Sequence, residues 1–402
     1  MGFLSRRPQQ ATPVPSGDGG ASSGETRPGE TRPGETPPGQ TPRGAAGPPP
    51  RKILLIRPRW MGDVLLSTPL LRALRLAYPQ AQLDYLTTAP CAQMLLGNPH
   101  LDRVLAYPRH DRPWMYLQVA RALRQEQYDV VIDLEGARSP ARLTWATRAP
   151  TRIGYDSSAT RWAYTHRVPE QDNRRYWVLA QAELLRPLGL AVDSIRAELF
   201  LNEWDRARAA RILAPLGLAA GDAFAALTPG SAAAHNLWPA DRYAQVADHL
   251  AARWGLRTVL LYGPGQEGIV RAVREAVRRP EACVIAVTPT MREAAAVVER
   301  SRLYVGSDTG TRHLAIALDV PTVGVFGRQF PERWTPPHAA AHLAAAYDPG
   351  CKDHCYYRTC EHVQCIRGIP VSAVLDKVDA LLNLPAAGRS PAAGASSPSA
   401  GP

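Results

Sequence analysis

The sequence lacks the features that define several common classes of protein. Its apolar runs are all far shorter than the roughly 20 residues that a membrane-spanning helix needs. It contains no G-x-G-x-x-G fingerprint of dinucleotide-binding proteins and no motif of a nucleic-acid-binding fold. These absences argue against a membrane-spanning protein, a nicotinamide-dependent enzyme and a nucleic-acid-binding protein.

The N-terminus also lacks a targeting signal. It has no apolar core of a signal peptide, and Arg6 stands where a myristoylation site requires serine or threonine. We therefore expect a cytoplasmic protein. Its six cysteines are expected to be thiols or metal ligands, because structural disulfides are rare in that compartment.

The charge balance is strongly basic. The 402 residues carry a formal net charge of +11, and the excess is almost wholly arginine. A basic balance of this size favours phosphate-bearing partners, either nucleotides or an anionic membrane surface. We therefore expect an anionic substrate and peripheral contact with a membrane.

Composition and hydrophobic patterning divide the chain into tails and ordered domains. Residues 1–50 and 385–402 are rich in Pro, Gly, Ser and Thr and are predicted to be disordered tails. Between them, alternating strand and helix patterns predict an α/β protein with two Rossmann-like, doubly wound parallel-sheet domains. The predicted divisions are an N-terminal domain at 51–205, a linker at 206–222, a second domain at 223–370 and a last helix at 371–384.

One carboxylate follows the first predicted strand. The apolar run Lys52–Arg57 leads through a tight loop to Asp63, at the start of a helical pattern. Asp63 suits a helix cap, and the spacing alone favours that interpretation. The alternative is a general base, provided that a substrate hydroxyl comes within hydrogen-bond distance.

A second stretch, Ser307–Ala315, follows a predicted strand at Leu303–Gly306 and opens a helix. Asp308 or Thr309 can cap this helix, and Gly310 allows the backbone to approach a ligand. Backbone N–H groups at such a helix start suit a phosphate, to which His313 would add a hydrogen bond. Without other support, an ordinary capped turn explains the stretch equally well.

Two further loops of the second domain carry candidate ligand groups. Thr228, Gly230 and Ser231 follow a strand, where small residues and hydroxyls suit phosphate contact. Glu267 opens a helix and is suited to pair with a ribose diol. A plain connection for the first loop and a surface acid for the second are the alternatives.

Four cysteines lie within fifteen residues, accompanied by His354 and His362. Four thiolates can close a structural zinc site, although the usual Cys-x2-Cys knuckle is missing. A redox-labile disulfide pair and plain free thiols remain open. The cysteines of this segment, 351–365, are Cys351, Cys355, Cys360 and Cys365.

These segments together resemble a known family. The chain contains, in order, IRPRWMGDVLLSTPLLRALRLAYP, DVVIDLEG, RIGYD, LTPGS, LYGPGQE and VGSDTGTRHLAIALDVPTVGVFG. From about Lys52 to Leu382 it resembles the heptosyltransferase family of bacterial lipopolysaccharide core synthesis. The most specific parts are MGDVLLSTPLLRALR and SDTGTRHLAIAL.

The resemblance implies the GT-B fold, in which two domains face a central cleft, and an inverting transfer of heptose from ADP-heptose. The acceptor would be a Kdo or heptose residue of a lipid A-linked core oligosaccharide, at the cytoplasmic face of the inner membrane. No metal or other cofactor is needed for this chemistry. Asp63 falls on the family's catalytic base and Glu267 on its ribose-binding acid. The other donor-side positions are Thr228, Gly230, Ser231, Asp308, Thr309, Gly310 and His313.

One position departs from the family pattern. The family usually has Lys or Arg just before the equivalent of Trp238, whereas this chain has Asn236. Losing a cation that faces the leaving diphosphate typically costs a few kcal/mol of transition-state stabilisation. Arg312, Arg328 or a protonated His235 are the candidates to replace it. The departure keeps two alternatives open, namely another nucleotide-sugar donor and a non-catalytic nucleotide- or glycan-binding homologue.

Overall fold

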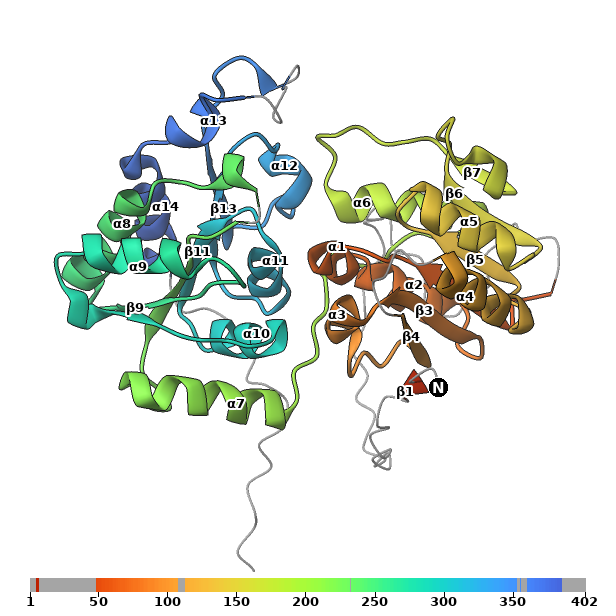
Figure 1. Ribbon diagram of the computed structural model, residues 1–402, viewed down its shortest axis with the longest axis horizontal. Helices are drawn as coiled ribbons and strands as arrows, with labels where there is room; N and C mark the ends of the chain where they lie inside the picture. Colours follow the sequence, from red (N-terminus) through yellow and green to blue (C-terminus); the bar gives the residue numbers. More distant parts are fainter. Residues whose placement is uncertain are drawn as a thin grey trace, which may run out of the picture. The chain divides into compact units, whose positions relative to one another are not determined.

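The computed structural model describes residues 5–6, 48–107, 113–231, 233–352, 355 and 360–384. Nearly all of both predicted tails therefore lies outside the described residues. The chain forms two compact units (Figure 1). The first contains the chain up to Arg59, Ser67–Glu170 and Gln181–Ser194, and the second contains Trp60–Leu66, Gln171–Ala180 and the chain from Ile195 onward. The predicted domains were continuous stretches, whereas each unit is assembled from several segments.

The first unit is built on a seven-stranded sheet in the order β1-β4-β3-β2-β5-β6-β7. Strand β1 is antiparallel to its neighbour and all other pairs are parallel. The predicted strand after residue 51 is present, and its Ile53, Leu54, Leu55 and Ile56 are fully buried, as expected for a central parallel strand. The strands are β1 (Ser5–Arg6), β2 (Lys52–Ile56), β3 (Gln82–Thr88), β4 (Arg103–Tyr107), β5 (Val130–Asp133), β6 (Thr151–Tyr155) and β7 (His166–Val168).

Helices cover this sheet, and local sequence explains several of their ends. Helix α2 has Pro69 in its first turn, where the missing N–H costs nothing, and Pro79 follows its end. Helix α6 (Trp177–Ala182) begins in the second unit, ends in the first and continues as a 3-10 helix containing Pro187. The other helices are α2 (Thr68–Ala77), α3 (Ala89–Ala92), α4 (Pro113–Gln125) and α5 (Arg138–Ala146), with 3-10 turns η1 (Gln93–Leu95), η2 (Arg161–Ala163) and η3 (Glu183–Leu188).

The second unit has a six-stranded, all-parallel sheet in the order β10-β9-β8-β11-β12-β13. The strand patterns in the sequence end at Thr322–Phe326, so the strand at His342–Ala346 was not predicted. The missed strand has the sequence HLAAA, whose alanines have little intrinsic strand preference, so its pairing with β12 decides its conformation. The strands are β8 (Phe224–Thr228), β9 (Arg257–Leu260), β10 (Cys283–Ile285), β11 (Leu303–Ser307), β12 (Thr322–Phe326) and β13 (His342–Ala346).

The helices of this unit include two that begin with capping boxes, at Asn202 and Thr290. These helices, α7 and α10, are joined by the buried ion pair of Asp205 with Arg292, so the segment predicted to lead into a linker is firmly packed. The helices are α1 (Met61–Leu66), α7 (Glu203–Leu213), α8 (Ala240–Trp254), α9 (Glu267–Ala276), α10 (Met291–Glu299), α11 (Gly310–Ala317), α12 (Pro331–Trp334), α13 (Gln364–Arg367) and α14 (Val371–Asn383), with 3-10 turns η4 (Ala214–Leu216), η5 (Ala234–Asn236) and η6 (Pro280–Ala282). No helix in the described part of the chain is long and apolar enough to cross a membrane.

The strand orders locate the place in each sheet where a ligand is expected. In the first sheet the chain order reverses between β2 and β5, and in the second between β8 and β11. Loops that leave the carboxyl ends of such neighbouring strands diverge, which opens a crevice. Asp63 follows β2, whereas Thr228 ends β8 and Asp308 follows β11. The candidate residues thus follow the strands at the two switch points.

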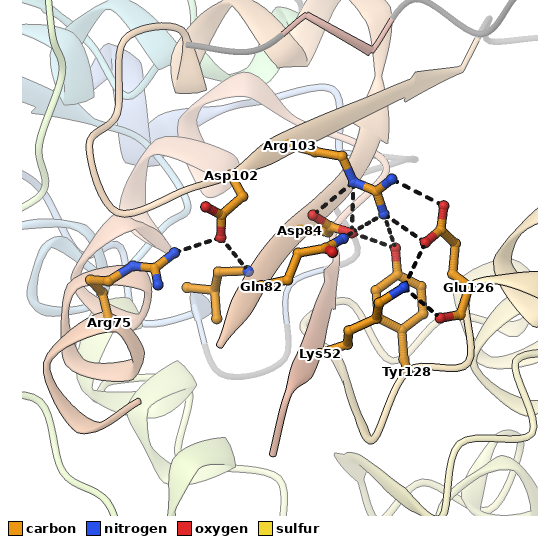
Figure 2. Close-up of polar contacts among 9 residues, drawn as sticks. Lys52, Arg75, Gln82, Asp84, Asp102, Arg103, Glu126 and Tyr128 are labelled. Atoms are coloured by element: carbon orange, nitrogen blue, oxygen red, sulfur yellow. Dashed lines mark hydrogen bonds and ion pairs between the residues drawn. The ribbon is translucent and has the colours of Figure 1, made fainter. Parts of the chain in front are cut away.

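The amino ends of β2, β3 and β4 are held by a compact polar cluster (Figure 2). The buried carboxylate of Asp84 accepts hydrogen bonds from Arg103 Nε at 3.1 Å and from the Tyr128 hydroxyl at 2.7 Å. Arg103 also pairs with Glu126, which in turn accepts from Lys52 Nζ. The charges are mutually satisfied, and the cluster lies at the sheet edge away from the switch point. Its role is therefore structural.

Candidate active site

The candidate anion site lies at the start of α11. Strand β11 ends at Ser307, and the N-cap Thr309 is extended with φ −143° and ψ 167°, so that α11 starts at Gly310. The Thr309 side chain makes no capping hydrogen bond. The first backbone N–H groups of the helix are therefore left for another acceptor, as an anion site requires.

Helix α1 approaches the start of α11 through two glycines. A Cβ atom at Gly62 would lie 2.8 Å from Cδ2 of His313, and one at Gly310 would lie 3.8 Å from the Gly62 nitrogen. Only a residue without a side chain fits at Gly62 without displacing the imidazole. This approach places Asp63, which is 9% exposed, one residue from the contact with His313 and close enough for its charge to act on Asp308.

The residue before α1 has a strained backbone. Trp60 has φ 69°, a conformation that bulky residues rarely adopt, and its indole is exposed. Sequence reasoning did not single out Trp60, because a left-handed conformation in a tight loop is normally signalled by glycine or asparagine. Strain of this kind is concentrated at functional sites, and here it occurs three residues before Asp63.

Burial sets the charge states of Asp308 and His313. The pKa of Asp308 is raised to about 6, because burial raises it strongly, Arg312 opposes the shift and the nearby charge of Asp63 adds to it. Burial, with a smaller contribution from Arg312, lowers the pKa of His313 to about 3. His313 is therefore neutral at physiological pH. A neutral imidazole can donate one hydrogen bond while its second nitrogen accepts another, and Nδ1 has no partner among the described residues.

The neutral state of His313 predicts a pH-dependent stability. Its pKa is lower in the folded chain than in the unfolded chain, so its contribution is complete above the unfolded pKa and is lost as pH falls toward the folded value. Relative to His313→Gln, the wild-type chain should lose about 2 kcal/mol between pH 7 and pH 5. Urea unfolding at the two pH values measures this difference. The exposed His166→Gln serves as the control, and equal pH dependence in all three chains would contradict the assignment.

A group of buried hydroxyls lies beneath the start of α11. The hydroxyls of Thr228 and Thr309 lie beside that of Tyr304, and burial raises the pKa of Tyr304 to about 12. None of the three makes a hydrogen bond of good geometry within the described residues. The sequence analysis missed Tyr304, because a tyrosine inside a buried strand is most simply explained as core packing.

The loop after β8 is closely covered by the loop after β9. Gly230 is buried, and a Cβ there would overlap the side-chain amide of Gln266, whose Oε1 accepts from the Gly263 N–H at 3.0 Å. Ser231 Oγ accepts from the Ala233 N–H, and Glu267 is exposed at the first turn of α9. Close packing against Gln266 therefore explains the glycine at 230. The Glu267 side chain is exposed and accessible to a ligand.

Arg312, one of the candidates for the missing cation, is enclosed by protein. It is fully buried, and its Nη1 and Nη2 donate to Trp334 O and Thr335 Oγ1, both at 2.9 Å. Its guanidinium lies 4.9 Å from the centre of the Phe326 ring. Gly324 makes room for it, because a Cβ there would overlap Arg312 Nε. The guanidinium thus holds α12 in place, and these contacts engage it within the protein.

The other two candidate cations differ in charge state. Burial lowers the pKa of His235, and the charge of Arg328 lowers it further, so protonation of His235 is disfavoured at neutral pH. Arg328 follows β12, is partly exposed and lies close enough to His235 to act on its pKa. Asn236, where a cation was expected, is buried. Arg328 is therefore the candidate whose position and charge both suit a bound anion.

An aromatic group beside His313 was also missed by sequence reasoning. The Trp334 ring lies 5.6 Å from the His313 ring and 5.9 Å from the Trp177 ring, measured between centroids. The Arg333 guanidinium lies 4.6 Å from the Trp177 ring centre, and Arg174 covers Phe330 at 4.3 Å. These contacts join segment 171–180 to α12. They could not be predicted from the four-residue sequence PERW of α12, because they involve side chains distant in the chain.

The cysteine segment is described only in part, at 351–352, 355 and 360–365. Cys365 is buried in α13, which raises the pKa of its thiol, and Cys355 and Cys351 lie close enough to raise it further. All four cysteines are free thiols. The described residues contain no group of three His, Cys, Asp or Glu side chains placed to hold a metal ion, and His354 lies outside them. The zinc site stays a prediction.

Fold and site together define a class of protein. Each of two doubly wound parallel sheets has its expected ligand edge at a switch point, and one unit has a helix start whose N-cap side chain makes no capping hydrogen bond, as an anion site requires. A buried carboxylate, Asp63, lies in the same unit, and the chain has no Gly-rich dinucleotide loop. These features fit a GT-B glycosyltransferase.

Comparison with known proteins identifies the family. The model of glycosyltransferase family 9 (heptosyltransferase) matches residues 116–362, more than half of the chain. The protein belongs to this family and is a glycosyltransferase, which confirms the resemblance found in the sequence.

Its relatives include enzymes of lipopolysaccharide assembly. Lipopolysaccharide heptosyltransferase 3 of Escherichia coli is 26% identical over 294 residues, covering 69% of this chain and 84% of the relative. Lipopolysaccharide heptosyltransferase 2 of Salmonella typhimurium is 24% identical over 303 residues, covering 71% and 85%.

Solved structures confirm the GT-B fold. A glycosyl transferase family 9 protein from Veillonella parvula superposes with a TM-score of 0.71 at 24% identity, covering 83% of this chain and 97% of that one. The ADP-heptose lipopolysaccharide heptosyltransferase II of Escherichia coli gives a TM-score of 0.66 at 22% identity, covering 82% and 98%.

Proposed function

We propose that this protein is an inverting heptosyltransferase that moves heptose from ADP-heptose to a Kdo or heptose residue of the lipopolysaccharide inner core. The observation that carries the proposal is the approach of α1 to α11 at Gly62, which brings the charge of Asp63 close enough to act on Asp308 at the start of α11. The relatives named as lipopolysaccharide heptosyltransferases support the substrate class. So does the fold shared with a heptosyltransferase solved with ADP-2-deoxy-2-fluoro heptose, at a TM-score of 0.62 and 20% identity.

In this proposal the second unit holds the donor. The N–H groups at the start of α11 bind the diphosphate of ADP, and the neutral His313 donates a further hydrogen bond. The exposed Glu267 accepts from the ribose hydroxyls, and Arg328 faces the negative charge that develops on the leaving diphosphate. The proposal requires these donors to be in position before the reaction, so that little reorganisation accompanies the departure of ADP.

Asp63 is the general base. Its carboxylate takes the proton of the acceptor hydroxyl while that oxygen forms a bond to the anomeric carbon of heptose. The bond from the anomeric carbon to the diphosphate oxygen breaks on the opposite face, which inverts the configuration. ADP leaves with the electron pair. No metal or other cofactor has a part in this mechanism.

The alternatives are another nucleotide-sugar donor and a homologue without turnover. We would incubate the purified chain with core oligosaccharide acceptors that end in Kdo or in heptose and with ADP-heptose, ADP-glucose, UDP-glucose or GDP-mannose in parallel, and detect products by mass spectrometry. Transfer from ADP-heptose alone supports the proposal. Transfer from another donor, or tight ADP binding without any transfer, would establish one of the alternatives.

A single substitution tests the role of Arg328. Arg328→Gln should lower kcat for transfer about 100-fold, because it removes a charge-assisted contact to the leaving group, while the Kd for ADP changes less. Arg211→Gln, which removes an exposed arginine of α7, is the control. An unchanged kcat in the Arg328 variant would mean that the missing cation at Asn236 has no replacement there.

The site of action and the metal content are part of the proposal. We place the protein in the cytoplasm, acting at the inner face of the inner membrane, where a lipid A-linked acceptor is found.

Structural zinc bound by the cysteine segment would be detected by elemental analysis of the purified protein. Its removal by a chelator should lower stability without changing the chemistry at Asp63.

A further inference from the structure

The first unit carries an exposed face that the proposed transfer does not use. On α5, Arg138, Arg142 and Trp145 recur at positions i, i+4 and i+7 and are all exposed, so they share the outer side of the helix. Trp162 of η2 meets Trp145 edge to face, with ring centroids 6.2 Å apart. Both indoles remain about half exposed, at 47% and 48%.

Helix α4 extends this face. It lies beside α5 (Figure 1), and the Tyr116 hydroxyl of α4 donates to the Ser139 carbonyl at the start of α5. Trp114 and Leu117 on α4 are 52% and 70% exposed, and Arg121 follows one turn later. Three exposed tryptophans and a leucine are therefore gathered on adjoining elements.

The arginines of this face are not neutralised. Arg121, Arg138, Arg142 and Arg148 are exposed and form no ion pair with an acid among the described residues. Arg148 instead lies 5.4 Å above the Trp145 ring. We call this surface the basic-aromatic face, comprising Trp114, Leu117, Arg121, Arg138, Arg142, Trp145, Arg148 and Trp162.

We propose that the basic-aromatic face docks on an anionic lipid bilayer. Tryptophan prefers the headgroup level of a bilayer, where its ring is apolar and its N–H remains solvated. Guanidinium groups bind phosphate, and each cation near an anionic surface adds to the attraction. A protein partner is the weaker fit, because it would need carboxylates placed to match each arginine, whereas an anionic bilayer offers phosphate groups to all of them whatever their spacing. Docking does not depend on the proposed reaction, so the two are tested separately.

The test measures sedimentation of the full chain with vesicles, without donor or acceptor. We expect binding to vesicles of phosphatidylcholine mixed with phosphatidylglycerol, much weaker binding to phosphatidylcholine alone, and a decline with added salt. The double substitution Arg138→Gln and Arg142→Gln should weaken binding about 30-fold. Trp145→Ala with Trp162→Ala should weaken it at least about tenfold and abolish fluorescence quenching by brominated lipid.

Matched controls come from the second unit. Arg211→Gln with Arg271→Gln removes the same net charge from exposed positions outside the face, and Trp204→Ala removes an indole that is 61% exposed. These variants should bind vesicles like the wild type. Circular dichroism and the unfolding midpoint of every variant show whether it is folded.

Three results would overturn the proposal. The first is absent binding of the wild type, and the second is equal binding to neutral and anionic vesicles. The third is binding by the face variants that matches that of the control variants. If the face variants instead change the sedimentation coefficient of the free protein, the face is an interface between copies of the chain. Loss of heptosyl transfer with normal vesicle binding would count against the proposed function alone.

Discussion

Asp63→Asn is expected to lower kcat for heptosyl transfer by about 10³-fold, because the amide cannot accept the proton of the acceptor hydroxyl. The shape of the side chain is kept, so the start of α11 and its partners should remain in place. The Kd for ADP should therefore change little. Single-turnover kinetics with saturating donor and calorimetric titration of ADP measure the two quantities.

The matched control for this variant is Asp241→Asn, which changes an exposed carboxylate on α8 of the same unit. It should leave both kcat and the Kd for ADP unchanged. A pH profile adds a second readout, since loss of the base removes the acid limb of the rate. The structure already shows that Asp63 is not the cap that its spacing suggested, because α1 begins at Met61 and Asp63 lies within its first turn. Should the Asp63 variant transfer heptose at the wild-type rate, the assignment of Asp63 as the base would be wrong.

Arg103→Leu is expected to destabilise the chain by about 3 kcal/mol, the largest effect on stability that we predict. It removes the cation opposite the carboxylate of Asp84, which is fully buried at the amino end of β3 (Figure 2). Tyr128 and Gln82 would still donate to Asp84, but no positive charge would remain beside it. Denaturant unfolding of the purified protein measures the loss.

A double-mutant cycle separates the loss of the ion pair from the loss of packing. Asp84→Leu combined with Arg103→Leu should be more stable than Arg103→Leu alone, because no buried charge is left uncompensated. Arg271→Leu, at an exposed position of α9, should change stability by less than about 0.5 kcal/mol. If Arg103→Leu behaves like this control, Asp84 is solvated well enough without its partner.

The sequence predicted the two parallel sheets and the place of the anion site, because both depend on local patterns. Buried parallel strands are continuous apolar runs, as in Lys52–Ile56 and Thr322–Phe326. A polar residue followed by glycine after such a strand marks a helix start, as at Asp308–Gly310. The packing of Gly62 against His313 was not predictable from pattern, since it joins residues about 250 positions apart.

The features that sequence reasoning missed share a physical cause. Arginine at 312 was a plausible phosphate ligand on composition alone, but tertiary packing encloses it against Phe326 and the end of α12. Strand β13 has weak intrinsic preference and depends on its partner. In both cases a contact between residues distant in sequence decides the conformation or the burial of the residue. A single sequence does not show which of the possible distant contacts forms.

The packing of Arg312 against Gly324 couples two positions of the second unit. A Cβ at 324 would lie 2.4 Å from Arg312 Nε and 2.6 Å from Cε2 of Phe326. A side chain at 324 would therefore displace the guanidinium, the ring or both, and with the guanidinium the hydrogen bond that it donates to Trp334 O. The effects of substitutions at 312 and 324 on stability are thus expected to be non-additive.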